Sequence, residues 1–538
     1  MTFSIAGDVP LFCNPDKTLK LQRLLFTSKT ENPFPQNNTL AFYVQSMYKI
    51  CMTTQYKLTN EERDFFLQVS EAAFSNPFSD ARDGADRALA GISGSDRDRA
   101  LQGATKAIRQ RLSDLNSQGR ANLALYDGAD RQLLLTAILF DQYHVSLPQF
   151  DALIEEQIHA GEEPCAVPFS AEALTRLRDY GCTAQQARHY FAFFYQLRRG
   201  FFFINQLVGS SASMRTLRCR LWNTIFTHDT QRYEVTLWNR LEDFSTLLLG
   251  ETGTGKGAAA AAIGRSGFIP FDEKSSRFAE SFTRNFIAIN LSQFPESLIE
   301  SELFGHKKGA FTGAVDNHQG VFARCVPHGA IFLDEIGDVS VPVQIKLLQV
   351  LQERRFCPVG SHVAQSFRGR IIAATNRSLE ELRRAGNFRD DFYYRLCSDV
   401  IEVPTLRKQL AESPDALPSL LERLIVRIVG TEDAKLAETI HRQLMEDLPP
   451  NYSWPGNVRE LEQAVRRLLL NGHYYGDPYA HTGSGDNLKT LADSGTMDAQ
   501  QLLSRYCRQL YDRFGTYEEV ARRTRLDRRT VKKYIQGE

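Results

Sequence analysis

A lysine in a glycine-rich loop is the residue of this sequence whose surroundings are best suited to phosphate chemistry. Three leucines precede the loop and a run of alanines follows it, a pattern that predicts a strand, a loop and a helix. Backbone N–H groups in such a loop bind phosphate oxygens, and the lysine ammonium reaches the β- and γ-phosphates. The predicted phosphate-binding residues are Gly250, Glu251, Thr252, Gly253, Thr254, Gly255, Lys256 and Gly257.

The loop departs from the strict nucleotide-binding motif at one position. Gly257 stands where a serine or threonine hydroxyl normally binds magnesium. A glycine-rich turn with a chance lysine is therefore an alternative interpretation of the loop taken alone. The residues that follow in the chain have to decide between the two.

Two carboxylates, Asp334 and Glu335, follow the apolar run 329–333. Buried parallel strands deliver polar groups at their carboxyl ends, so the pattern predicts a strand that presents both acids to one site. We expect Asp334 to hold Mg²⁺, directly or through water, and Glu335 to orient and polarise the water that attacks the γ-phosphate. A buried strand with ordinary capping acids is the alternative.

A third apolar run, 370–374, ends in Thr375 and Asn376. We expect these polar residues to sense the γ-phosphate from an adjacent strand. Strands that alternate with helices form a parallel sheet covered on both faces. The three runs together therefore predict an α/β nucleotide-binding domain.

The composition of the whole chain limits what else the protein can be. Domains of roughly 100 to 200 residues predict three or four of them in 538 residues. The 64 basic and 64 acidic residues cancel, so any affinity for nucleic acid must be local. Nine scattered cysteines without a Cys-x-x-Cys pair argue against a disulfide framework or a structural zinc site and favour the cytoplasm. Without a secretion signal or an apolar run of about 18 residues, no membrane span is predicted.

Residues 1–206 predict a mainly helical input domain. Apolar residues recur at spacings of three and four from about residue 60 to residue 159, and a second helical stretch covers 170–206. The aromatic runs of this second stretch indicate either residues of a hydrophobic core or a helix that links this domain to the next. The polar segment 79–99 indicates a long loop or a solvated helix. No glycine-rich loop, metal-ligand spacing or nucleophile motif occurs in this domain. The sequence therefore predicts neither which signal the domain senses nor whether the domain represses or assists the ATPase.

A loop tip is predicted between the first two nucleotide motifs. Its two glycines permit a tight turn that presents the phenylalanine and the threonine outward. The six residues are Gly309, Ala310, Phe311, Thr312, Gly313 and Ala314. This GAFTGA sequence resembles the signature of the bacterial enhancer-binding proteins, AAA+ ATPases that activate transcription by RNA polymerase carrying sigma-54.

The resemblance covers about 207–471, because several motifs follow in the family's order. It implies an AAA+ α/β ATPase domain at 207–402 and an α-helical lid at 403–471. It also implies that the GAFTGA loop contacts sigma-54. The matching segments are 250–256 (Walker A), 331–335 (Walker B), 347–353 with 358–360 (the approach to sensor 1), 375–376 (sensor 1), 388–396 (arginine-finger segment) and 454–461 (sensor 2 helix).

The resemblance implies roles for four further residues. Arg389 and Arg395 resemble arginine fingers, which act on the γ-phosphate across a subunit boundary and imply a homo-oligomeric ring, usually a hexamer. Surface ion pairs are the alternative for these two. Arg459 resembles the arginine that reports nucleotide state to the lid. Asn290 resembles the asparagine that pairs with the Walker B glutamate and relays hydrolysis to the GAFTGA loop.

The chain departs from the family in two respects. Members commonly carry glutamate after the Walker A lysine, so the missing hydroxyl is weaker evidence against a nucleotide-binding loop than the strict motif suggests. Gly257 is still unusual at this position, and it lowers local helix preference by about 1 kcal/mol. Two segments, 228–244 and 267–281, are lengthened relative to the family. Neither reaches a predicted catalytic group.

The C-terminal region is locally basic. A flexible linker is predicted at 472–497, and ten basic residues face five acidic ones from Arg505 to Glu538. Short helices are predicted at 516–524 and 528–535, around a turn with Asp527 as N-cap. Residues 498–538 thereby resemble the Fis-type helix-turn-helix that ends most members of the family.

The second helix of such a module enters the major groove of DNA, and the preceding helix, 499–514, could pair two subunits on a palindromic enhancer. A basic solvated tail is the alternative. The candidates for phosphate and base contacts are Arg528, Arg529, Thr530, Lys532 and Lys533.

The sequence thus predicts an α-helical N-terminal domain, an α/β AAA+ P-loop ATPase domain with a helical lid, and a C-terminal helix-turn-helix. The predicted function is ATP-dependent activation of transcription, in which the protein binds enhancer DNA and uses ATP and Mg²⁺ to remodel the closed promoter complex of sigma-54 RNA polymerase. An alternative is a DNA-binding regulator whose AAA+ domain serves as a nucleotide-dependent oligomerisation module without sigma-54 contact. Gly257 is its only support. A AAA+ motor for other protein substrates is disfavoured by the C-terminal module.

Overall fold

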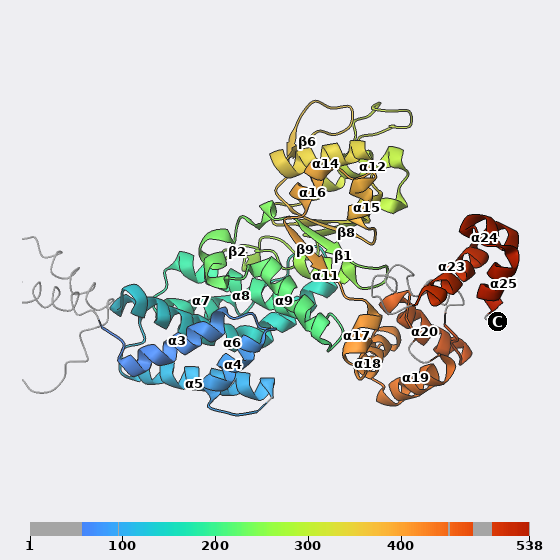
Figure 1. The fold of residues 1–538 in the computed structure, drawn as a ribbon. Helices are drawn as coiled ribbons and strands as arrows, with labels where there is room; N and C mark the ends of the chain where they lie inside the picture. The colour runs from blue at the N-terminus through green and yellow to red at the C-terminus, as the bar shows by residue number, and fades with distance from the viewer. Residues whose placement is uncertain (1–55, 95, 450–451, 477–497, 537–538) are drawn as a thin grey trace, which may run out of the picture. The chain divides into compact units, whose positions relative to one another are not determined.

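The computed structural model describes residues 56–94, 96–449, 452–476 and 498–536 (Figure 1). The first 55 residues of the predicted input domain and residues 477–497 of the predicted linker lie outside the described residues. Contacts divide the chain into two compact units. The first comprises the described residues up to His159, with Pro164–Arg198 and Pro270–Ala279, and the second comprises Ala160–Glu163, Arg199–Ile269 and the described residues from Glu280 onward.

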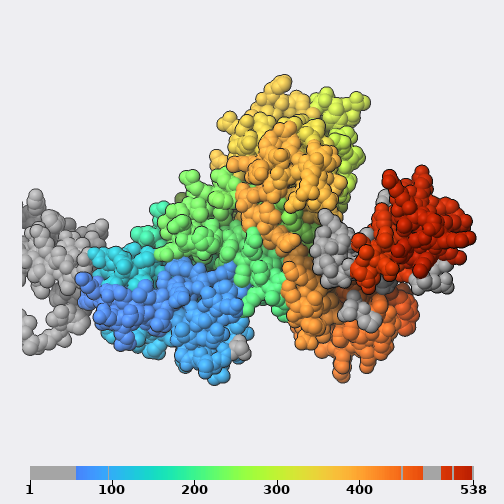
Figure 2. Space-filling view, in the orientation of Figure 1, coloured from blue at the N-terminus to red at the C-terminus, as the bar shows by residue number. Residues whose placement is uncertain are grey.

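The first unit is mainly helical, as the spacing of its apolar residues predicts. At the start of α3, the Thr59 hydroxyl accepts a hydrogen bond from the Glu62 N–H and the Glu62 carboxylate accepts one from the Thr59 N–H, which satisfies two otherwise free donors. The side chains of α3 to α5 fill the spaces between their ribbons (Figure 2). The helices are α3 (Asn60–Phe74), α4 (Asp80–Ala90), α5 (Arg97–Ser117), α6 (Gly128–Ala160), α7 (Ser170–Asp179) and α8 (Ala184–Asn205), the last of which continues into the second unit.

Two features of this unit settle questions that the sequence leaves open. The polar segment 79–99 contains a helix, α4, for which Ser79 is the N-cap. A short antiparallel hairpin, β2 (Phe271–Asp272) and β3 (Arg277–Phe278), also belongs to the first unit, although it comes from the lengthened segment 267–281. Each unit is therefore built from stretches that are not consecutive in the sequence.

The second unit is built around a five-stranded parallel sheet. The order of its strands is β4-β5-β8-β1-β9, and every pairing in it is parallel. This confirms the α/β architecture predicted from the apolar runs. The strands are β1 (Thr246–Leu249), β4 (Phe286–Asn290), β5 (Ala330–Asp334), β8 (Arg370–Thr375) and β9 (Asp399–Glu402).

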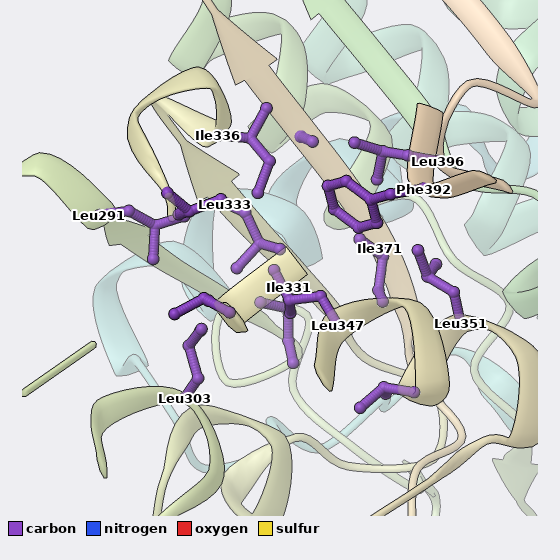
Figure 3. Close-up of a cluster of buried hydrophobic side chains, with 14 of the residues drawn as sticks. Leu291, Leu303, Ile331, Leu333, Ile336, Leu347, Leu351, Ile371, Phe392 and Leu396 are labelled. Atoms are coloured by element: carbon purple, nitrogen blue, oxygen red, sulfur yellow. The ribbon is translucent and has the colours of Figure 1, made fainter. Parts of the chain in front are cut away.

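One face of the sheet carries the largest part of the core. Ile331 and Leu333 of β5 point to this face with Ile371 of β8, because alternate residues of a strand share a face. They pack with leucines of α14 and with Phe392 of α16 (Figure 3).

α11 packs against β5 and β8. The helices of the α/β part are α9 (Ala212–Phe226), α10 (Thr230–Arg232), α11 (Lys256–Gly264), α12 (Glu296–Phe304), α13 (Val321–Arg324), α14 (Val341–Glu353), α15 (Leu379–Arg384) and α16 (Asp390–Leu396).

Short elements join these helices and strands. A π-helical turn, η2, and a 3-10 turn, η3, lie in the lengthened segment 228–244, where Tyr233 is fully buried. A second hairpin follows α14. The short elements of this part are η2 (Tyr233–Leu237), η3 (Leu241–Asp243), η4 (Leu291–Gln293), η5 (Ile336–Asp338), β6 (Arg355–Phe356) and β7 (Gln365–Ser366).

A separate hydrophobic cluster holds the helical lid together. Its buried members include Leu420, Leu444 and Leu461, one from each of three helices. The helices are α17 (Leu406–Glu412), α18 (Ala416–Val429), α19 (Ala434–Asp447) and α20 (Asn457–Asn471).

The C-terminal residues form three helices, α23 (Ala499–Phe514), α24 (Tyr517–Thr524) and α25 (Arg528–Gln536). Cys507, Val520 and Val531 are fully buried between them. The Asp527 carboxylate accepts hydrogen bonds from the N–H groups of Arg529 and Thr530, as expected of an N-cap. Among the helices that the structure describes, none is long and apolar enough to cross a membrane.

Candidate nucleotide-binding site

The carboxyl ends of the parallel strands bring the predicted site residues to one edge of the sheet. Leu249, the last residue of β1, lies beside Thr375 of β8, and Asn290 of β4 lies beside Asp334 of β5. Strands β5 and β8 are themselves neighbours. Ligands bind outside the carboxyl ends of such strands. The loop after β1, the two acids and the polar ends of β4 and β8 therefore surround one candidate site.

The loop between β1 and α11 combines left-handed glycines with a buried lysine. Gly253 and Gly255 have φ values of +79° and +102°, a region that glycine adopts without steric cost. The Lys256 ammonium donates hydrogen bonds to the carbonyl oxygens of Gly250, at 2.9 Å, and Glu251, at 3.2 Å. Burial lowers the pKa of Lys256, and the nearby carboxylates of the site oppose this shift. The ammonium thus lies over its own loop, where phosphate oxygens can replace the carbonyls.

Asp334 ends β5 and Glu335 follows it, and the two carboxylates are held in different ways. The Asp334 carboxylate accepts a hydrogen bond from the Glu335 N–H at 3.1 Å. Burial raises the pKa of Asp334, and the positive charges of Lys256 and Arg459 oppose the shift. Burial also raises the pKa of Glu335. Both effects reflect the cost of removing a carboxylate from water.

Glu335 has an unusual backbone. Its φ of +56° lies in the left-handed region, which is uncommon for a residue with a side chain. Its Oε2 accepts a hydrogen bond from the Asn376 N–H at 3.3 Å. The Asn376 amide in turn donates to the Thr252 hydroxyl at 2.9 Å. Asn376 therefore connects the acid after β5 with the loop after β1.

Asn290 does not pair with Glu335 in this structure. Its side-chain oxygen accepts hydrogen bonds from the N–H of Ser292 at 3.0 Å and from the Ser292 hydroxyl at 2.7 Å. It lies next to Asp334 through the strand register alone. The proposed pairing with Glu335 stays a prediction for another state of the site.

Asn457 is a site residue that the sequence analysis missed. It is fully buried, with a φ of +53°. Its amide donates to Glu251 Oε2 at 3.2 Å and to the Thr252 carbonyl at 3.1 Å, and its oxygen accepts from the Leu406 N–H at 2.8 Å. The asparagine after Pro455-Gly456 was the available signal, since asparagine tolerates left-handed backbone in turns.

A second lid contact reinforces this link. The Arg407 guanidinium donates to Glu251 Oε2 at 2.8 Å and also contacts Oε1. The hydrogen bond with Arg407 lowers the pKa of Glu251. The start of α20 packs closely on the loop as well, because a Cβ at Gly253 would lie 2.2 Å from the Gly456 carbonyl and 2.9 Å from Arg459 Cβ. The lid therefore holds the predicted phosphate loop at several atoms.

The two predicted arginine fingers differ in their hydrogen-bond partners. Arg389 is the N-cap residue of α16, and its guanidinium donates to Asp391 at 3.0 and 2.7 Å, with the side chain 40% exposed. Arg395 donates from Nε and Nη2 to the Leu351 carbonyl near the end of α14, at 3.2 and 3.0 Å. A guanidinium at a helix C-terminus satisfies free carbonyls. Arg389 therefore pairs with a neighbouring carboxylate, whereas Arg395 pairs with a backbone carbonyl, and Arg395 is exposed while Arg389 is partly exposed.

The residues at this edge fit a nucleoside triphosphate with a divalent cation. Gly253 and Gly255 leave backbone N–H groups without covering side chains, and Lys256 supplies a cation. Asp334 supplies the carboxylate oxygen that Mg²⁺ prefers. Gly257 supplies no hydroxyl, but a Cβ there would be only in ordinary contact, 4.0 Å from Phe332 Cε1. Steric exclusion therefore does not account for the glycine.

The six residues 309–314 lie on a loop tied at its base. The N–H groups of His306 and His318 each donate to the other's carbonyl at 3.0 Å. Phe311 is 36% exposed, with its ring 5.0 Å from that of His306. Gly309 and Gly313 have φ values of +78° and +103°. Figure 1 shows loops that extend beyond α12 and α14 in this part of the chain.

A neighbouring loop supports the 309–314 loop. Val359 accepts a backbone hydrogen bond from the Lys307 N–H at 3.0 Å. Gly360 lies so close that a Cβ there would be 2.7 Å from the Cβ of Ala310. Thr312 is exposed beyond these contacts. The arrangement presents Phe311 and Thr312 at the surface, as the two glycines predict.

The predicted DNA-contacting residues lie on α25. Arg529, Lys532 and Lys533 are exposed, whereas Arg528 forms an ion pair with Glu518 at 3.0 Å. The Thr530 hydroxyl contacts the Asp527 carboxylate. Four cations are therefore exposed on one short helix, and one of them, Arg528, is held in an ion pair.

Comparison with known proteins identifies the central region. Residues 230–402 match the sigma-54 interaction domain, which confirms the resemblance indicated by the GAFTGA sequence. A Nif-specific regulatory protein of Enterobacter agglomerans is 41% identical over 269 residues, which cover 50% of this chain and 45% of that protein. The transcriptional regulatory protein ZraR of Klebsiella oxytoca is 38% identical over 302 residues, which cover 54% of this chain and 62% of that protein. The chain thus spans about half the length of the curated relatives it matches.

A solved structure is also similar. NtrX from Brucella abortus in complex with ATP aligns with a TM-score of 0.38 and 20% sequence identity, covering 68% of this chain and 79% of that one.

Proposed function

We propose that this protein is an ATP-dependent activator of transcription that binds enhancer DNA and remodels the closed promoter complex of sigma-54 RNA polymerase. The observation that carries the proposal is the exposed 309–314 loop within a region that matches the sigma-54 interaction domain. The alternative, an oligomerisation module without sigma-54 contact, gives no reason for an exposed aromatic residue on a loop supported at its base.

ATP hydrolysis is the proposed source of work. In this proposal Lys256 exchanges its carbonyl partners for β- and γ-phosphate oxygens. Mg²⁺, when bound at Asp334, would neutralise charge on those phosphates. Glu335 accepts a proton from the attacking water, which it orients while Asn376 fixes its position. Asn457 and Arg407 report the state of the loop to the lid through Glu251.

A ring of subunits is part of the proposal. Arg389 acts on the γ-phosphate of a neighbouring subunit, because its side chain is 40% exposed and its guanidinium pairs with the adjacent Asp391. Stabilisation of transition-state charge by such an arginine is typically large. The proposed domains are an input domain at 1–206, the ATPase at 207–402, the lid at 403–471, a linker at 472–497 and a DNA-binding module at 498–538.

The loop is tested by Thr312→Ala in the full-length protein. We expect open-complex formation on a sigma-54 promoter to be lost while ATP turnover is unchanged, because Thr312 is remote in sequence from every phosphate ligand proposed here. Val315→Ala, which changes another exposed residue next to the same six-residue loop (68% exposed), is the control and should retain open-complex formation. Full activity of Thr312→Ala would show that the loop does not act in this way.

The site is tested by two further variants. Lys256→Ala should lose nucleotide binding, since no other ammonium is placed over the loop in the proposed site. Glu335→Gln should bind ATP without turnover, because the amide cannot accept the proton of water. Hydrolysis at the native rate in either variant would contradict the assignment. A sigma-54 pull-down in the presence of a transition-state analogue separates the proposal from the oligomerisation alternative.

A further inference from the structure

The hairpin β2–β3 interrupts the sequence between α11 and β4 but belongs to the helical unit. Its two strands pair Phe271 with Phe278 and Asp272 with Arg277. Residues Pro270–Ala279 fall in the first unit, whereas the chain on both sides falls in the second. The chain therefore leaves the ATPase part after α11, contributes ten residues to the helical unit, and returns before β4.

Both phenylalanines of the hairpin are buried among aromatic residues of α8. The Phe278 ring stacks on that of Tyr195, with centroids 4.0 Å apart, and lies parallel to the ring of Phe191 at 6.0 Å. The Phe271 ring meets Phe191 edge-on at 4.9 Å. Phe271 and Phe278 are only 7% and 5% exposed. The hairpin therefore contributes to the core of the helical unit rather than to its surface.

Backbone hydrogen bonds and ion pairs also hold the hairpin in place within the helical unit. The Val167 N–H donates to the Ser276 carbonyl at 2.9 Å, and Ala166 forms an antiparallel bridge with Arg277. The Glu273 carboxylate accepts hydrogen bonds from Arg178 at 2.5 Å and from Arg188 at 3.2 Å. One turn residue thus pairs with two helices, α7 and α8.

The same helix α8 also carries a contact to the end of the Walker A helix. Arg199 is fully buried and donates to the carbonyls of Arg265 at 2.5 Å and Gly267 at 2.6 Å. These carbonyls follow directly after α11, which begins at Lys256. On one continuous helix, Phe191 therefore contacts the hairpin. Arg199, eight residues later on the same helix, contacts the segment that leads into the hairpin.

We propose that the 270–279 hairpin is a docking element through which the helical unit controls the segment after the Walker A helix, so that the state of the helical unit sets nucleotide affinity. The proposal rests on the nucleotide site described above. It gives the lengthened segment a purpose, because an insertion that served only the ATPase fold would bury its aromatic residues there. Coupling between two sites is reciprocal, so nucleotide binding also changes how firmly the hairpin is docked.

The first test uses the unmodified full-length protein. Hydrogen exchange at the Val167 amide reports docking, since this N–H donates to the Ser276 carbonyl of the hairpin. We expect a saturating non-hydrolysable ATP analogue to change the exchange rate at Val167 by at least about fivefold, the low end of typical coupling. An unchanged rate at saturation would overturn the proposal.

The second test reverses a charge. Glu273→Arg places three cations together, so exchange at Val167 should rise and affinity for the ATP analogue should change by at least about fivefold. Adding Arg178→Glu restores one ion pair and should return both values toward those of the native protein. Lys274→Glu, at an exposed neighbouring turn position, is the control and should change neither.

The outcomes separate this proposal from the proposed function. Faster exchange at Val167 in Glu273→Arg with native nucleotide affinity would show docking without coupling and overturn the inference. Altered affinity with native exchange would overturn it as well. If the native protein binds the analogue but does not turn over ATP, the proposed function fails while both exchange tests still decide the coupling.

Discussion

Lys256 and Asn457 hold the phosphate loop from its two sides. The lysine binds two loop carbonyls from within. The asparagine binds the loop from the lid and uses both its donor and its acceptor. Because Asn457 is fully buried, each of these groups would be costly to leave without a partner. Residues outside the phosphate loop thus decide how firmly the loop is held.

Asn457→Ala should weaken nucleotide binding. The change leaves the Leu406 N–H without its acceptor and removes a residue suited to a positive φ, at a cost of about 1–3 kcal/mol. A loss of that size in the nucleotide-ready state corresponds to an increase of about 5-fold to about 150-fold in Kd, measured with a fluorescent ATP analogue. Asn471→Ala, at the exposed end of the same helix, should bind normally. Equal Kd values in both variants would refute a role for Asn457.

The pH dependence of turnover should report Glu335. Its burial raises the pKa above the ordinary value of 4.5, so the carboxylate needed as base is present above that raised pKa and lost as the pH falls through it. ATP turnover at saturating ATP, followed downward from about pH 8, should therefore decline at a pH above 4.5. Circular dichroism over the same range controls for unfolding. A folded protein with full turnover at pH 4.5 would argue against Glu335 as the base.

Individual residues also show where sequence reasoning is reliable. The place of Lys256, Asp334 and Thr375 near one edge of the sheet was predictable because each lies close to the end of an apolar strand, while their roles stay predictions. Arg395 was harder to judge, since its carbonyl partner on Leu351 is 44 residues away in sequence. Asn457 was missed for the same reason, because its partners Glu251 and Thr252 lie more than 200 residues earlier.

At the scale of elements, α11 begins with an unusual pair of residues. Lys256 is its first residue and Gly257 its second. The glycine costs helix stability without relieving a clash, since a Cβ would only reach ordinary contact with Phe332. Five alanines of this helix follow the glycine directly and offset part of that cost.

Gly257→Ala should stabilise the protein, because alanine favours the helix by about 1 kcal/mol relative to glycine. The thermal midpoint of the second unit should rise by about 2–4 °C. Gly257→Ser adds a hydroxyl at the same Cβ, so comparison with Gly257→Ala isolates the effect of an oxygen ligand. We expect the serine variant to show the lower magnesium requirement for ATP turnover. A lower midpoint for Gly257→Ala would mean that the glycine backbone is required.

The elements themselves were predictable to different degrees. The sheet strands were predicted because each is a continuous apolar run next to a recognisable polar end. The hairpin β2–β3 could not be predicted, since strands of two residues carry no periodicity. Its partners Phe191 and Tyr195 also lie about 80 residues earlier, beyond any local pattern. Long-range packing therefore decides its place.

At the scale of the whole molecule, the charge is distributed unevenly. Equal numbers of acidic and basic residues conceal four exposed cations on α25. Cations on a helix that enters the major groove bind phosphates and displace counterions. The proposed DNA contact should therefore depend strongly on salt.

Arg529→Ala should weaken DNA binding and reduce its salt dependence. Loss of one phosphate contact lowers the slope of log K against log salt by about 1. Fluorescence anisotropy with a DNA duplex at several salt concentrations measures both effects. Arg522→Ala is the control, because Arg522 is engaged with Glu519 on α24. An unchanged slope for Arg529→Ala would place the DNA contact elsewhere.

The divided membership of the 270–279 hairpin constrains how such proteins can change by recombination. A helical unit exchanged as one N-terminal piece would leave Phe271 and Phe278 without Phe191 and Tyr195, the rings that bury them. A viable exchange must carry two separate stretches of the gene.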